Sequence, residues 1–559
     1  MKYYVIILFW FFGLTSLVAQ TTIGAIPPKD RACKSGGSIS TLEELLWLSE
    51  NTDAWSEDWV LEANIDATET MNWNEGKGFS PIGDSPSGFG IRQEIPFSGS
   101  FDGQNFEISN LYINRPDEPY VGFFGQVSGG AIKNLNLINH QVIGLRYTGG
   151  LIGYADFSSI IDSCSTFGIT EGAEVTGGLI GQIYQGVQTN YCHSNGSVSS
   201  NMWAGGLIGD NYSYSNIVNS YSNCQVSGVD YLGGLTGSNR WFSNINQCYA
   251  TGSVSGSGEF AGGLVGHLDD GAIINCFATG ETTAAYRIGG LIGESLFSEY
   301  SESGAYNCYS TGAVSGNGFV GGLVGRNYNY VTNCYFDTET SETDIGLGNN
   351  DSGQEAFGLI TEEFINEESF NDWDFQNTWS ISLNTIISPN GRPYFNWQLV
   401  NLFNIYFEAS EGGSIQGEKI QTVVLGESTQ AVTAVANDAY SFIEWQDEQD
   451  NIISTNPEII IHNITETQTY TAIFELNTSI QALGLIRPIV FYPNPATNQI
   501  TIITDELTIV KIIDMHAHTI EELCIFENTS LDIHHLRKGV YLIAITNSRE
   551  NKTEKLIIE

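Results

Sequence analysis

The string Ala261-Gly262-Gly263-Leu264-Val265-Gly266 is one copy of a pattern that recurs along the middle of the chain. Copies of Gly-Gly-Leu-x-Gly are separated by 28, 28, 28, 29, 27 and 32 residues. A degenerate copy, Val121-Gly122-Phe123-Phe124-Gly125, precedes the first by 28 residues. A nearly fixed period of this length is typical of repeat architectures. The copies begin at Gly149, Gly177, Gly205, Gly233, Gly262, Gly289 and Gly321.

Each repeat has a second landmark, a cysteine that is usually followed by an aromatic residue. Several repeats also contain a Thr-Gly-x-Val-Ser-Gly string, as at 251–256 and 311–316. We therefore expect three short β-prone arcs per repeat, separated by Gly, Asn and Ser turns, and no helical periodicity. The cysteines are Cys164, Cys192, Cys224, Cys248, Cys276, Cys308 and Cys334.

A repeat of about 28 residues is too small to bury its own apolar face, so copies must stack to bury one continuously. The pattern predicts a right-handed parallel β-helix, with coils about 4.8 Å apart and eight coils spanning roughly 40 Å. The paired glycines are expected to permit close backbone approach, which is a structural role. The leucines expected to form one inward column are Leu151, Leu179, Leu207, Leu235, Leu264, Leu291 and Leu323.

The cysteines are predicted to stack as a ladder of buried thiols if the coils are in register. Disulfides or a metal site are the alternatives. The chain has no CxxC pair and no cysteine cluster with histidine, which argues against a metal. Oxidation between adjacent coils stays open, because their Cα atoms would lie within disulfide range.

The chain has 559 residues and a formal net charge of −43. Such an acidic chain repels phosphate backbones, so a nucleic-acid partner is not expected. Its 41% hydrophobic content argues against disorder.

Residues 1–19 are predicted to be an export signal, with Lys2 before an apolar run at 5–12 and small residues at 16–20. The alternative is an uncleaved anchor, but no basic stop-transfer flank follows. The apolar run is shorter than a membrane span, and no later stretch is long enough, so a transmembrane protein is not expected.

The Gly-Gly-Leu-Ile/Val-Gly repeats resemble the GLUG motif family of bacterial surface adhesins and secreted peptidases. The resemblance covers roughly 37–400: a cap and first coils at 20–120, repeats at 121–345 and the solenoid end at 346–402. The string 97–103 and the alternating apolar residues after it fit the start of such a solenoid. Thr41-Leu42-Glu43-Glu44 predicts a capping box for a short helix that covers the first coil. The resemblance implies a β-helix and a surface role, and it carries no catalytic residue.

Residues 403–476 are predicted to form a small all-β module around Trp445, from alternating apolar residues. This segment is similar to the B-repeat of internalin-like surface proteins, which implies a spacer or a weak contact module. A linker at 477–486 follows.

Residues 487–559 contain Tyr492-Pro493-Asn494-Pro495 and then alternating strands, which predict a small β-sandwich. This segment resembles the C-terminal sorting domain of type IX secretion substrates, although it ends in Glu559 where many relatives end in a basic residue. The resemblance implies a partner in the type IX secretion machinery and a secreted or cell-surface location.

No catalytic motif is evident, since HExxH and GxSxG are both missing. The pairs His516/His518 and His534/His535 are expected to be solvated rather than metal ligands. Calcium is a weak prediction at Asp337 and Glu339, with Glu342 and Asp344 nearby; otherwise no cofactor is expected. Charged residues occur at scattered offsets after the repeat string, which is typical of solvated faces. They are Asp156, Asp210, Asp269, Asp270, Glu294, Arg146, Arg287 and Arg326.

Aromatic residues also follow the repeat string and would line up along one edge of the stacked coils. They could be a structural ring ladder over the core, or a platform for sugar rings or a partner protein. The chain is therefore predicted to be an adhesin or ligand-binding solenoid with a glycan or host-matrix ligand; the alternative is a polysaccharide-active enzyme or a non-catalytic module of a hydrolase. The candidate ligand-binding residues are Tyr154, Tyr184, Tyr212, Tyr214, Trp241, Tyr328 and Tyr330. Phe157, Phe242, Phe297 and Tyr300 belong to the same series.

Overall fold

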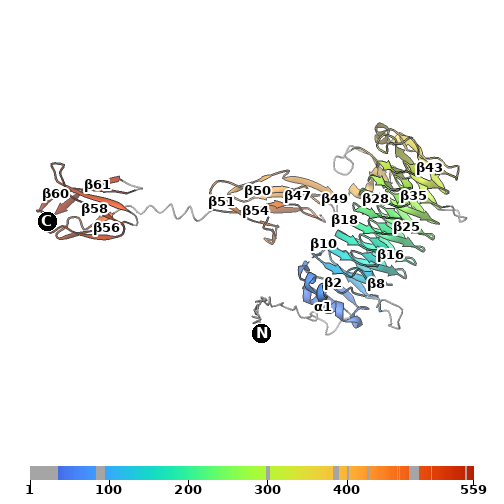
Figure 1. The fold of residues 1–559 in the computed structure, drawn as a ribbon, viewed down its shortest axis with the longest axis horizontal. Coiled ribbons are helices and arrows are strands. Elements are labelled where there is room, and N and C mark those ends of the chain that lie inside the picture. The colour runs from blue at the N-terminus through green and yellow to red at the C-terminus, as the bar shows by residue number, and fades with distance from the viewer. Residues whose placement is uncertain are drawn as a thin grey trace, which may run out of the picture.

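The computed structural model describes residues 36–83, 95–296, 303–381, 390–399, 402–424, 428–462, 464, 466–476, 490–504, 507–547 and 551–559. The export signal predicted over 1–19 and the linker predicted over 477–486 lie outside these residues. Figure 1 shows a solenoid of stacked coils, a β module beside it and a second β domain beyond the module.

Every pair of named solenoid strands is parallel, and four sheets run the length of the solenoid. We call the four sheets A, B, C and D. One coil comprises β11 from sheet D, β12 from sheet C, β13 from sheet A and β14 from sheet B. The expectation of three arcs per repeat was therefore wrong. The Gly-Gly-Leu string is not inside a strand but forms the corner at which the sheet D strand ends and the sheet C strand begins.

The strand bounds follow the repeat. Sheet A contains β1 (Gly37–Ile39), β2 (Asp58–Leu61), β4 (Ser100–Asp102), β9 (Ala131–Lys133), β13 (Ile160–Asp162), β17 (Gln188–Asn190), β21 (Asn216–Val218), β26 (Asn244–Asn246), β31 (Ala272–Ile274), β36 (Gly304–Tyr306) and β41 (Tyr330–Thr332). Sheet B contains β3 (Ile65–Asp66), β5 (Glu107–Ser109), β10 (Asn136–Ile143), β14 (Ser165–Glu171), β18 (His193–Ser200), β22 (Tyr221–Ser222), β27 (Tyr249–Ala250), β32 (Phe277–Ala278), β37 (Tyr309–Ser310), β42 (Tyr335–Asp337) and β44 (Phe357–Leu359). Beside this path it also holds β6 (Tyr112–Asn114), β23 (Gln225–Gly228), β28 (Val254–Gly256), β33 (Thr282–Thr283) and β38 (Val314–Ser315).

The two remaining sheets flank the Gly-Gly-Leu corner. Sheet C contains β8 (Phe124–Ser128), β12 (Ile152–Asp156), β16 (Ile180–Tyr184), β20 (Ile208–Tyr212), β25 (Thr236–Arg240), β30 (Val265–Asp269), β35 (Ile292–Ser295), β40 (Val324–Asn327) and β43 (Leu347–Asn350). Sheet D contains β7 (Pro119–Val121), β11 (Arg146–Gly149), β15 (Val175–Gly177), β19 (Trp203–Gly205), β24 (Leu232–Gly233), β29 (Phe260–Gly262), β34 (Arg287–Gly289) and β39 (Phe319–Gly321).

The predicted leucine column is present. Each of these leucines is fully buried, and the backbone N–H of each of the first six donates to the carbonyl of the equivalent leucine one coil later, with every N–O distance 2.9 Å. The last, Leu323, donates to the Gly346 carbonyl at 3.0 Å. The column therefore combines continuous apolar burial with a continuous main-chain hydrogen-bond ladder, which is what holds one coil on the next.

The cysteine ladder is present except at Cys224, where the prediction was wrong. Strand pairing aligns His193 with Tyr221, so Ser220 takes the ladder position in that coil. Its Oγ donates to the Val218 carbonyl at 2.8 Å, as the ladder thiols donate to the carbonyl two residues before them. Cys224 lies four residues farther on and packs in a separate apolar cluster with Val226. The uneven spacing of 32 and then 24 residues around Cys224 signals this shift.

The first coil is covered by helix α1 (Leu42–Glu50), whose predicted capping box at Thr41 and Glu44 is confirmed. Short 3-10 turns η1 (Thr52–Ala54), η2 (Thr68–Asn72) and η3 (Asn74–Gly76) follow. Later in the chain, residues 361–381 and 390–398 fold back over sheet B. They include η4 (Thr361–Ile365), η5 (Glu367–Ser369), β45 (Trp379–Ser380), β46 (Tyr394–Phe395) and α2 (Asn396–Leu399).

The module after the solenoid has two sheets packed around Trp445, which is fully buried. Its strands are β47 (Leu402–Ala409), β48 (Gly413–Gln416), β49 (Ile420–Val424), β50 (Val432–Ala436), β51 (Tyr440–Gln446), β52 (Ile452–Ser454), β53 (Glu458–Ile459) and β54 (Gln468–Leu476). The last domain is a sandwich of β55 (Val490–Tyr492), β56 (Gln499–Ile503), β57 (Thr508–Ile513), β58 (Thr519–Ile525), β59 (Thr529–Asp532), β60 (Gly539–Thr546) and β61 (Asn551–Ile558).

Candidate functional site

The outer face of sheet B carries two rows of side chains that repeat from coil to coil. In Cys248-Tyr249-Ala250-Thr251, the side chains of Cys248 and Ala250 are fully buried in the core, whereas those of Tyr249 and Thr251 point away from it. The same alternation occurs in Cys276-Phe277-Ala278-Thr279. One outward row is therefore aromatic and the other is hydroxyl or amide.

The aromatic row is a continuous stack. Neighbouring rings of His193, Tyr221, Tyr249, Phe277 and Tyr309 have centroids 4.8–4.9 Å apart and planes within 7° of parallel. Residues 361–381 and 390–398, which we call the covering segment, cover much of this stack with their own aromatic side chains. The covering rings are Phe364, Phe370, Trp373, Trp379, Phe395 and Trp397.

The polar row consists of Asn195, Asn223, Thr251 and Thr279, which occupy equivalent positions on four successive coils. The Thr251 hydroxyl donates to Asn223 Oδ1 at 2.5 Å. Successive members are one coil apart, or about 4.8 Å, so the row extends about 14 Å along the solenoid axis.

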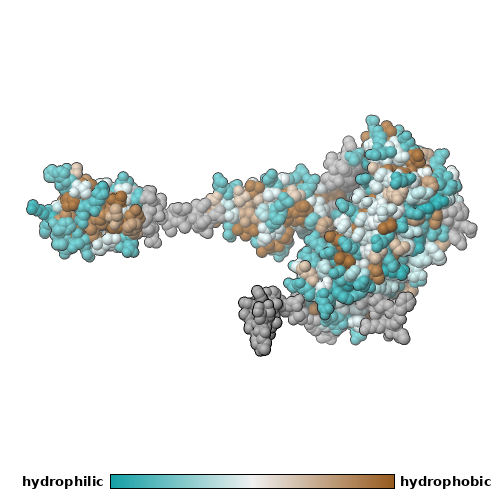
Figure 2. Space-filling model, viewed as in Figure 1, coloured by the Kyte–Doolittle hydropathy of each residue, from teal (hydrophilic) through white to brown (hydrophobic). Residues whose placement is uncertain are grey.

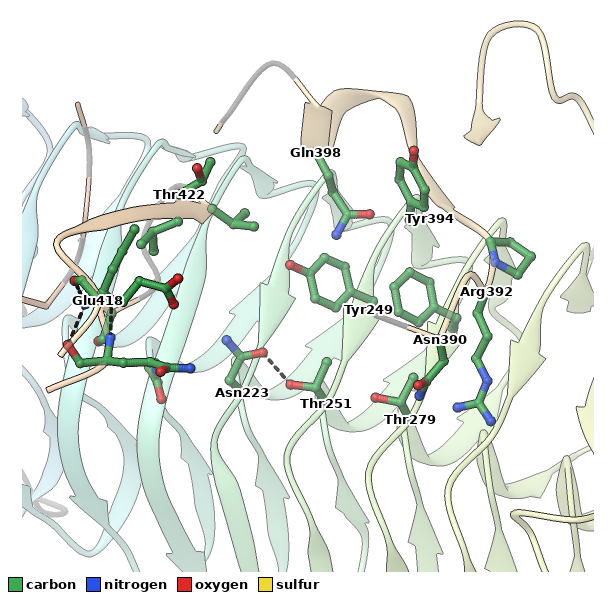
Figure 3. Close-up of a pocket in the computed structure, with 18 of the residues that line it drawn as sticks. Asn223, Tyr249, Thr251, Thr279, Asn390, Arg392, Tyr394, Gln398, Glu418 and Thr422 are labelled. Carbon is green, nitrogen blue, oxygen red and sulfur yellow. Dashed lines mark hydrogen bonds between the residues drawn. The ribbon is translucent and has the colours of Figure 1, made fainter. Parts of the chain in front are cut away.

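A cleft of about 960 Å³ opens above this row, between the solenoid and the module. Its floor includes Tyr249 and Phe277 as well as the polar row, and Figure 3 shows Gln398 reaching down toward Tyr249 from the covering segment. The covering segment and the module each supply a wall. The wall residues are Asn390, Arg392, Pro393, Tyr394 and Gln398 from the former, and Glu418, Ile420, Gln421, Thr422, Val423, Val424, Ser428 and Gln430 from the latter.

The wall residues are held by specific hydrogen bonds. Gln421 donates to the carbonyls of Glu418 and Gln430 and accepts from the Gln430 N–H. Gln398 accepts from the Phe395 N–H at 2.7 Å, and the Tyr309 hydroxyl donates to the Pro393 carbonyl at 2.6 Å. These hydrogen bonds fix the wall side chains, so the cleft is preformed.

A second cleft of about 810 Å³ lies between the module and the earlier coils of the solenoid. Near these clefts, the His462 ring of the module stacks on Phe167 of the solenoid, with centroids 4.4 Å apart and planes 21° from parallel. This ring pair is a direct contact between module and solenoid.

Asp337 and Glu339, the residues predicted for calcium, are engaged with protein groups. Asp337 is fully buried, and its carboxylate accepts from Arg392 at 2.7 Å and from the Thr361 hydroxyl at 2.9 and 3.0 Å. Glu339 accepts from the Thr361 N–H. Over the described ranges, no group of three or more His, Cys, Asp or Glu side chains could hold a metal ion.

The predicted aromatic residues fall into separate groups rather than one edge. Tyr154 contacts Tyr120 and Tyr147, because strand pairing places it opposite Gln182 rather than Tyr184. Tyr328 stacks against Arg326, and Tyr330 lies exposed on sheet A. Phe297 and Tyr300 lie outside the described residues.

A compact aromatic group does form on the turns between sheets C and A. Tyr184 stacks on Tyr212 at 5.2 Å, and Tyr212 meets Trp241 edge-on at 5.7 Å. Tyr214 stacks on Phe242 at 5.2 Å. Tyr214 is 61% exposed and Trp241 is 51% exposed, so this group presents ring area to solvent.

The expectation that the charged residues form solvated faces was wrong for Asp156, Asp210 and Glu294, which are all buried. Arg240 binds Asp210 through Nε at 3.1 Å and a terminal nitrogen at 2.5 Å. Glu294 lies between Arg287 and Arg326, at 3.2 and 3.4 Å. Burial raises the pKa of Glu294 although both guanidiniums oppose the shift.

His267 lies 4.0 Å from Glu294 on the same face. Burial, with Arg240 and Arg287 nearby, lowers the pKa of His267 to about 4. Its imidazole is therefore neutral at pH 7. His267, Glu294 and Arg326 each stand five residues after the first glycine of their repeat string, and strand pairing stacks these positions. This shared offset was a signal that sequence reasoning missed.

The histidine pairs in the last domain are exposed and lie beside carboxylates. His518 contacts Asp514 at 3.4 Å, and His534 contacts Asp532 at 2.6 Å. Each carboxylate also accepts a backbone N–H, so these are turn contacts.

Family models match three parts of the chain. The match over 490–559 is to the secretion system C-terminal sorting domain, and the match over 403–478 is to the divergent InlB B-repeat domain. The GLUG motif matches residues 259–283. This chain is a type IX secretion cargo built on a β-solenoid. The three predicted resemblances are confirmed, and the cargo is exported to the cell surface or the extracellular space. Its sorting domain implies contact with the secretion machinery.

No helix in the described part of this cargo is both long and apolar enough to cross a membrane.

Matches to whole proteins are partial. The cargo is 37% identical to halomucin of Haloquadratum walsbyi over 118 residues, which are 21% of this chain and 1% of halomucin. It also matches a Bacteroides ovatus crystal structure named as an immunoglobulin A1 protease, at 19% identity and a TM-score of 0.37, over 65% of this chain and 92% of that one. A second structure, an IgA1 protease, matches at 19% identity and a TM-score of 0.36, over 53% of this chain and 21% of that one.

Proposed function

We propose that this protein is a surface adhesin that binds its ligand without catalysis. The aromatic group on the turns between sheets C and A supports this proposal. We call Tyr212, Tyr214, Trp241 and Phe242 the aromatic platform. These four side chains come from two adjacent coils and form two ring pairs, Tyr212 with Trp241 and Tyr214 with Phe242. Tyr214 and Trp241 are more than half exposed.

Ring area left in water is unfavourable, and contiguous exposed apolar patches mark interaction sites more often than chance. Aromatic anchors also contribute strongly to binding, because they are large and have few rotatable bonds. A platform on the side of a rod suits attachment to another surface, whether it offers sugar rings or the apolar patch of a protein.

The surroundings of three carboxylates, Glu418 of the module and the buried Asp210 and Glu294 of sheet C, support binding rather than hydrolysis. Glu418 is the one carboxylate in the lining of the larger cleft. Asp210 and Glu294 are three coils apart, about 14 Å, and each is paired with arginine. Glycoside hydrolysis needs two carboxyl groups about 5–10 Å apart around one bond.

A binding screen against glycans and matrix proteins tests the proposal. The triple variant Tyr214→Ala, Trp241→Ala, Phe242→Ala should lose most of the binding, about tenfold or more, while its thermal unfolding stays cooperative. Tyr286→Ala is the matched control, because Tyr286 is a similarly exposed ring at a different corner of the solenoid. Unchanged binding by the folded triple variant would refute the platform.

A further inference from the structure

We infer that the larger cleft, between sheet B and the module, is a separate binding site for an extended neutral oligosaccharide. This inference does not depend on the aromatic platform, which lies on the turns between sheets C and A. It rests on the chemistry of the cleft lining, on the register of the polar row and on the pairing of the strands beneath it.

The lining is almost uncharged, although the chain as a whole has a net charge of −43. Its two charged side chains are Glu418 and Arg392, and Arg392 is already bound to the buried Asp337. An anionic ligand would find no uncommitted cation in the lining, and a cationic ligand would find one exposed carboxylate. The uncharged hydrogen-bonding side chains are Asn195, Asn223, Tyr249, Thr251, Thr279, Tyr309, Asn390, Tyr394, Gln398, Gln421, Thr422, Ser428 and Gln430.

Amides and hydroxyls that both donate and accept match the hydroxyl groups of a sugar. The polar row presents such a group once per coil over four coils, or about 14 Å. A linear ligand with hydroxyls along its length can contact the row at several points when it lies parallel to the solenoid axis. Figure 3 shows the row formed by Asn223, Thr251 and Thr279 beneath the walls.

The floor also has an apolar part. Tyr249 and Phe277 are stacked 4.8 Å apart with planes 1° from parallel, but they are only 5% and 6% exposed beneath the covering segment, so they contribute a narrow strip of ring edges beside the polar row. A sugar has both an apolar C–H face and polar edges, and a pocket that pairs apolar surface with a few fixed polar groups suits such a ligand.

An extended peptide fits the floor of this site less well. Peptide strands bind by adding to a free sheet edge, where unpaired N–H and C=O groups are available. The strands under the cleft, β22, β27 and β32, are each paired on both sides within sheet B, so the floor offers side chains only. In the wall, β49 is the edge strand of its sheet, and the polar row on the floor is what favours a sugar.

Titration calorimetry on the full exported chain tests the inference. The probes are linear neutral hexasaccharides of glucose, xylose and mannose, with hexagalacturonate as the acidic counterpart. We expect at least one neutral hexasaccharide to bind more tightly than hexagalacturonate. The double variant Asn223→Ala, Thr251→Ala should weaken that binding about tenfold, since each lost hydrogen bond contributes about 0.5–1.5 kcal/mol.

The matched control is Asn216→Ala, Asn244→Ala. These asparagines are also hydrogen-bonded across one coil, at 3.2 Å, but they lie on sheet A. Both this control and the platform triple variant should retain hexasaccharide binding. A second cleft variant, Thr279→Trp, should block binding by filling the floor while leaving the melting temperature of the solenoid within a few degrees.

Three results would overturn the inference: no neutral hexasaccharide binds, hexagalacturonate binds more tightly, or both folded cleft variants bind like the parent chain. If the platform variant alone loses hexasaccharide binding, the ligand belongs to the platform and not to the cleft.

Discussion

Each repeat glycine is required by a close contact and not by its backbone angle. A Cβ added to the first glycine of any Gly-Gly-Leu string would lie 1.9–2.1 Å from the carbonyl oxygen three residues later. At Gly178, the second glycine of its pair, a Cβ would lie 2.2 Å from the carbonyl of Gly206 in the next coil. Both distances are far below any real contact, so a methyl group can be accommodated only if the corner moves.

Gly205→Ala should therefore destabilise the solenoid by about 1–3 kcal/mol or more, because the new Cβ would lie 1.9 Å from the rigid Ile208 carbonyl. Urea unfolding followed by circular dichroism measures the change. Ser227→Ala, an exposed position on β23, is the control and should stay within about 0.5 kcal/mol. Equal stability of the two variants would contradict the close-contact argument.

His140 is another residue whose burial has a measurable consequence. Its ring lies in the core with Nε2 3.0 Å from the Thr170 hydroxyl. Burial lowers the pKa of His140 to about 4, against about 6.5 in an unfolded chain. Between these values the unfolded chain binds a proton that the folded chain does not, so the contribution of His140 to stability is full above pH 6.5 and falls as the pH drops toward 4.

The parent chain should therefore lose up to about 3 kcal/mol more than His140→Gln between pH 7 and pH 4.5. Urea midpoints at the two pH values measure the difference. His516→Gln, at an exposed turn, should show the same pH dependence as the parent chain. An identical pH dependence for His140→Gln would mean that burial does not lower the pKa of His140.

At the scale of elements, the covering segment determines which part of sheet B is buried and which part lines the cleft. The covering segment is anchored by Arg392, whose guanidinium reaches the buried Asp337 at the end of β42. It is also anchored by aromatic packing on the ring stack, including Trp379 on Phe277 and Phe395 on Tyr249. The same segment forms one wall of the cleft, so the ion pair and the site are structurally linked.

Asp337→Ala should cost about 3–5 kcal/mol, because it leaves the largely buried Arg392 without its counter-ion. Thermal unfolding with and without calcium or a chelator measures both the loss and any metal effect. We expect no calcium-dependent change in melting temperature, since Asp337 is engaged by Arg392 and Thr361. Glu342→Ala, at an exposed turn, is the control. A calcium-dependent rise in the parent that Asp337→Ala abolishes would instead establish a metal site.

At the scale of the molecule, polar and apolar surfaces are divided among the parts. Figure 2 shows hydrophilic residues over most of the visible solenoid face and apolar residues gathered on the module and the sorting domain. The module meets the solenoid through the His462–Phe167 ring pair. The sorting domain lies on the far side of the module from the solenoid (Figure 1).

Phe167→Ala should loosen the module from the solenoid, because it removes the ring on which His462 stacks at 4.4 Å. Small-angle scattering should then report a larger radius of gyration, and hydrogen exchange should increase around His462. Ile169→Ala is the matched control, since Ile169 is an exposed apolar residue on the same strand, β14. Unchanged scattering and exchange for Phe167→Ala would show that other contacts hold the module.

Sequence reasoning correctly predicted the features that depend on the repeat, on local spacing or on a motif. The leucine column, the capping box at Thr41, the buried Trp445 and the three family resemblances all follow from local spacing or from motifs. Sequence reasoning missed the cleft, although each position of the cysteine ladder on the middle coils is followed by an aromatic residue and then, two residues later, by Thr or Asn. Residues of this kind form the floor of the cleft. The walls of the cleft come from residues 390–398, 418–424 and 428–430, which are far from its floor in the chain.

The sequence alone determined that this chain is an exported stack of coils, because one repeat can bury its leucine only against the next. The tertiary structure alone decided that Ser220 fills the vacant position of the cysteine ladder and how the guanidiniums of Arg240, Arg287 and Arg326 meet their buried carboxylates. It also decided which part of sheet B stays open as a cleft. These outcomes depend on strand register and on segments folding back, and neither is encoded in the spacing of neighbouring residues.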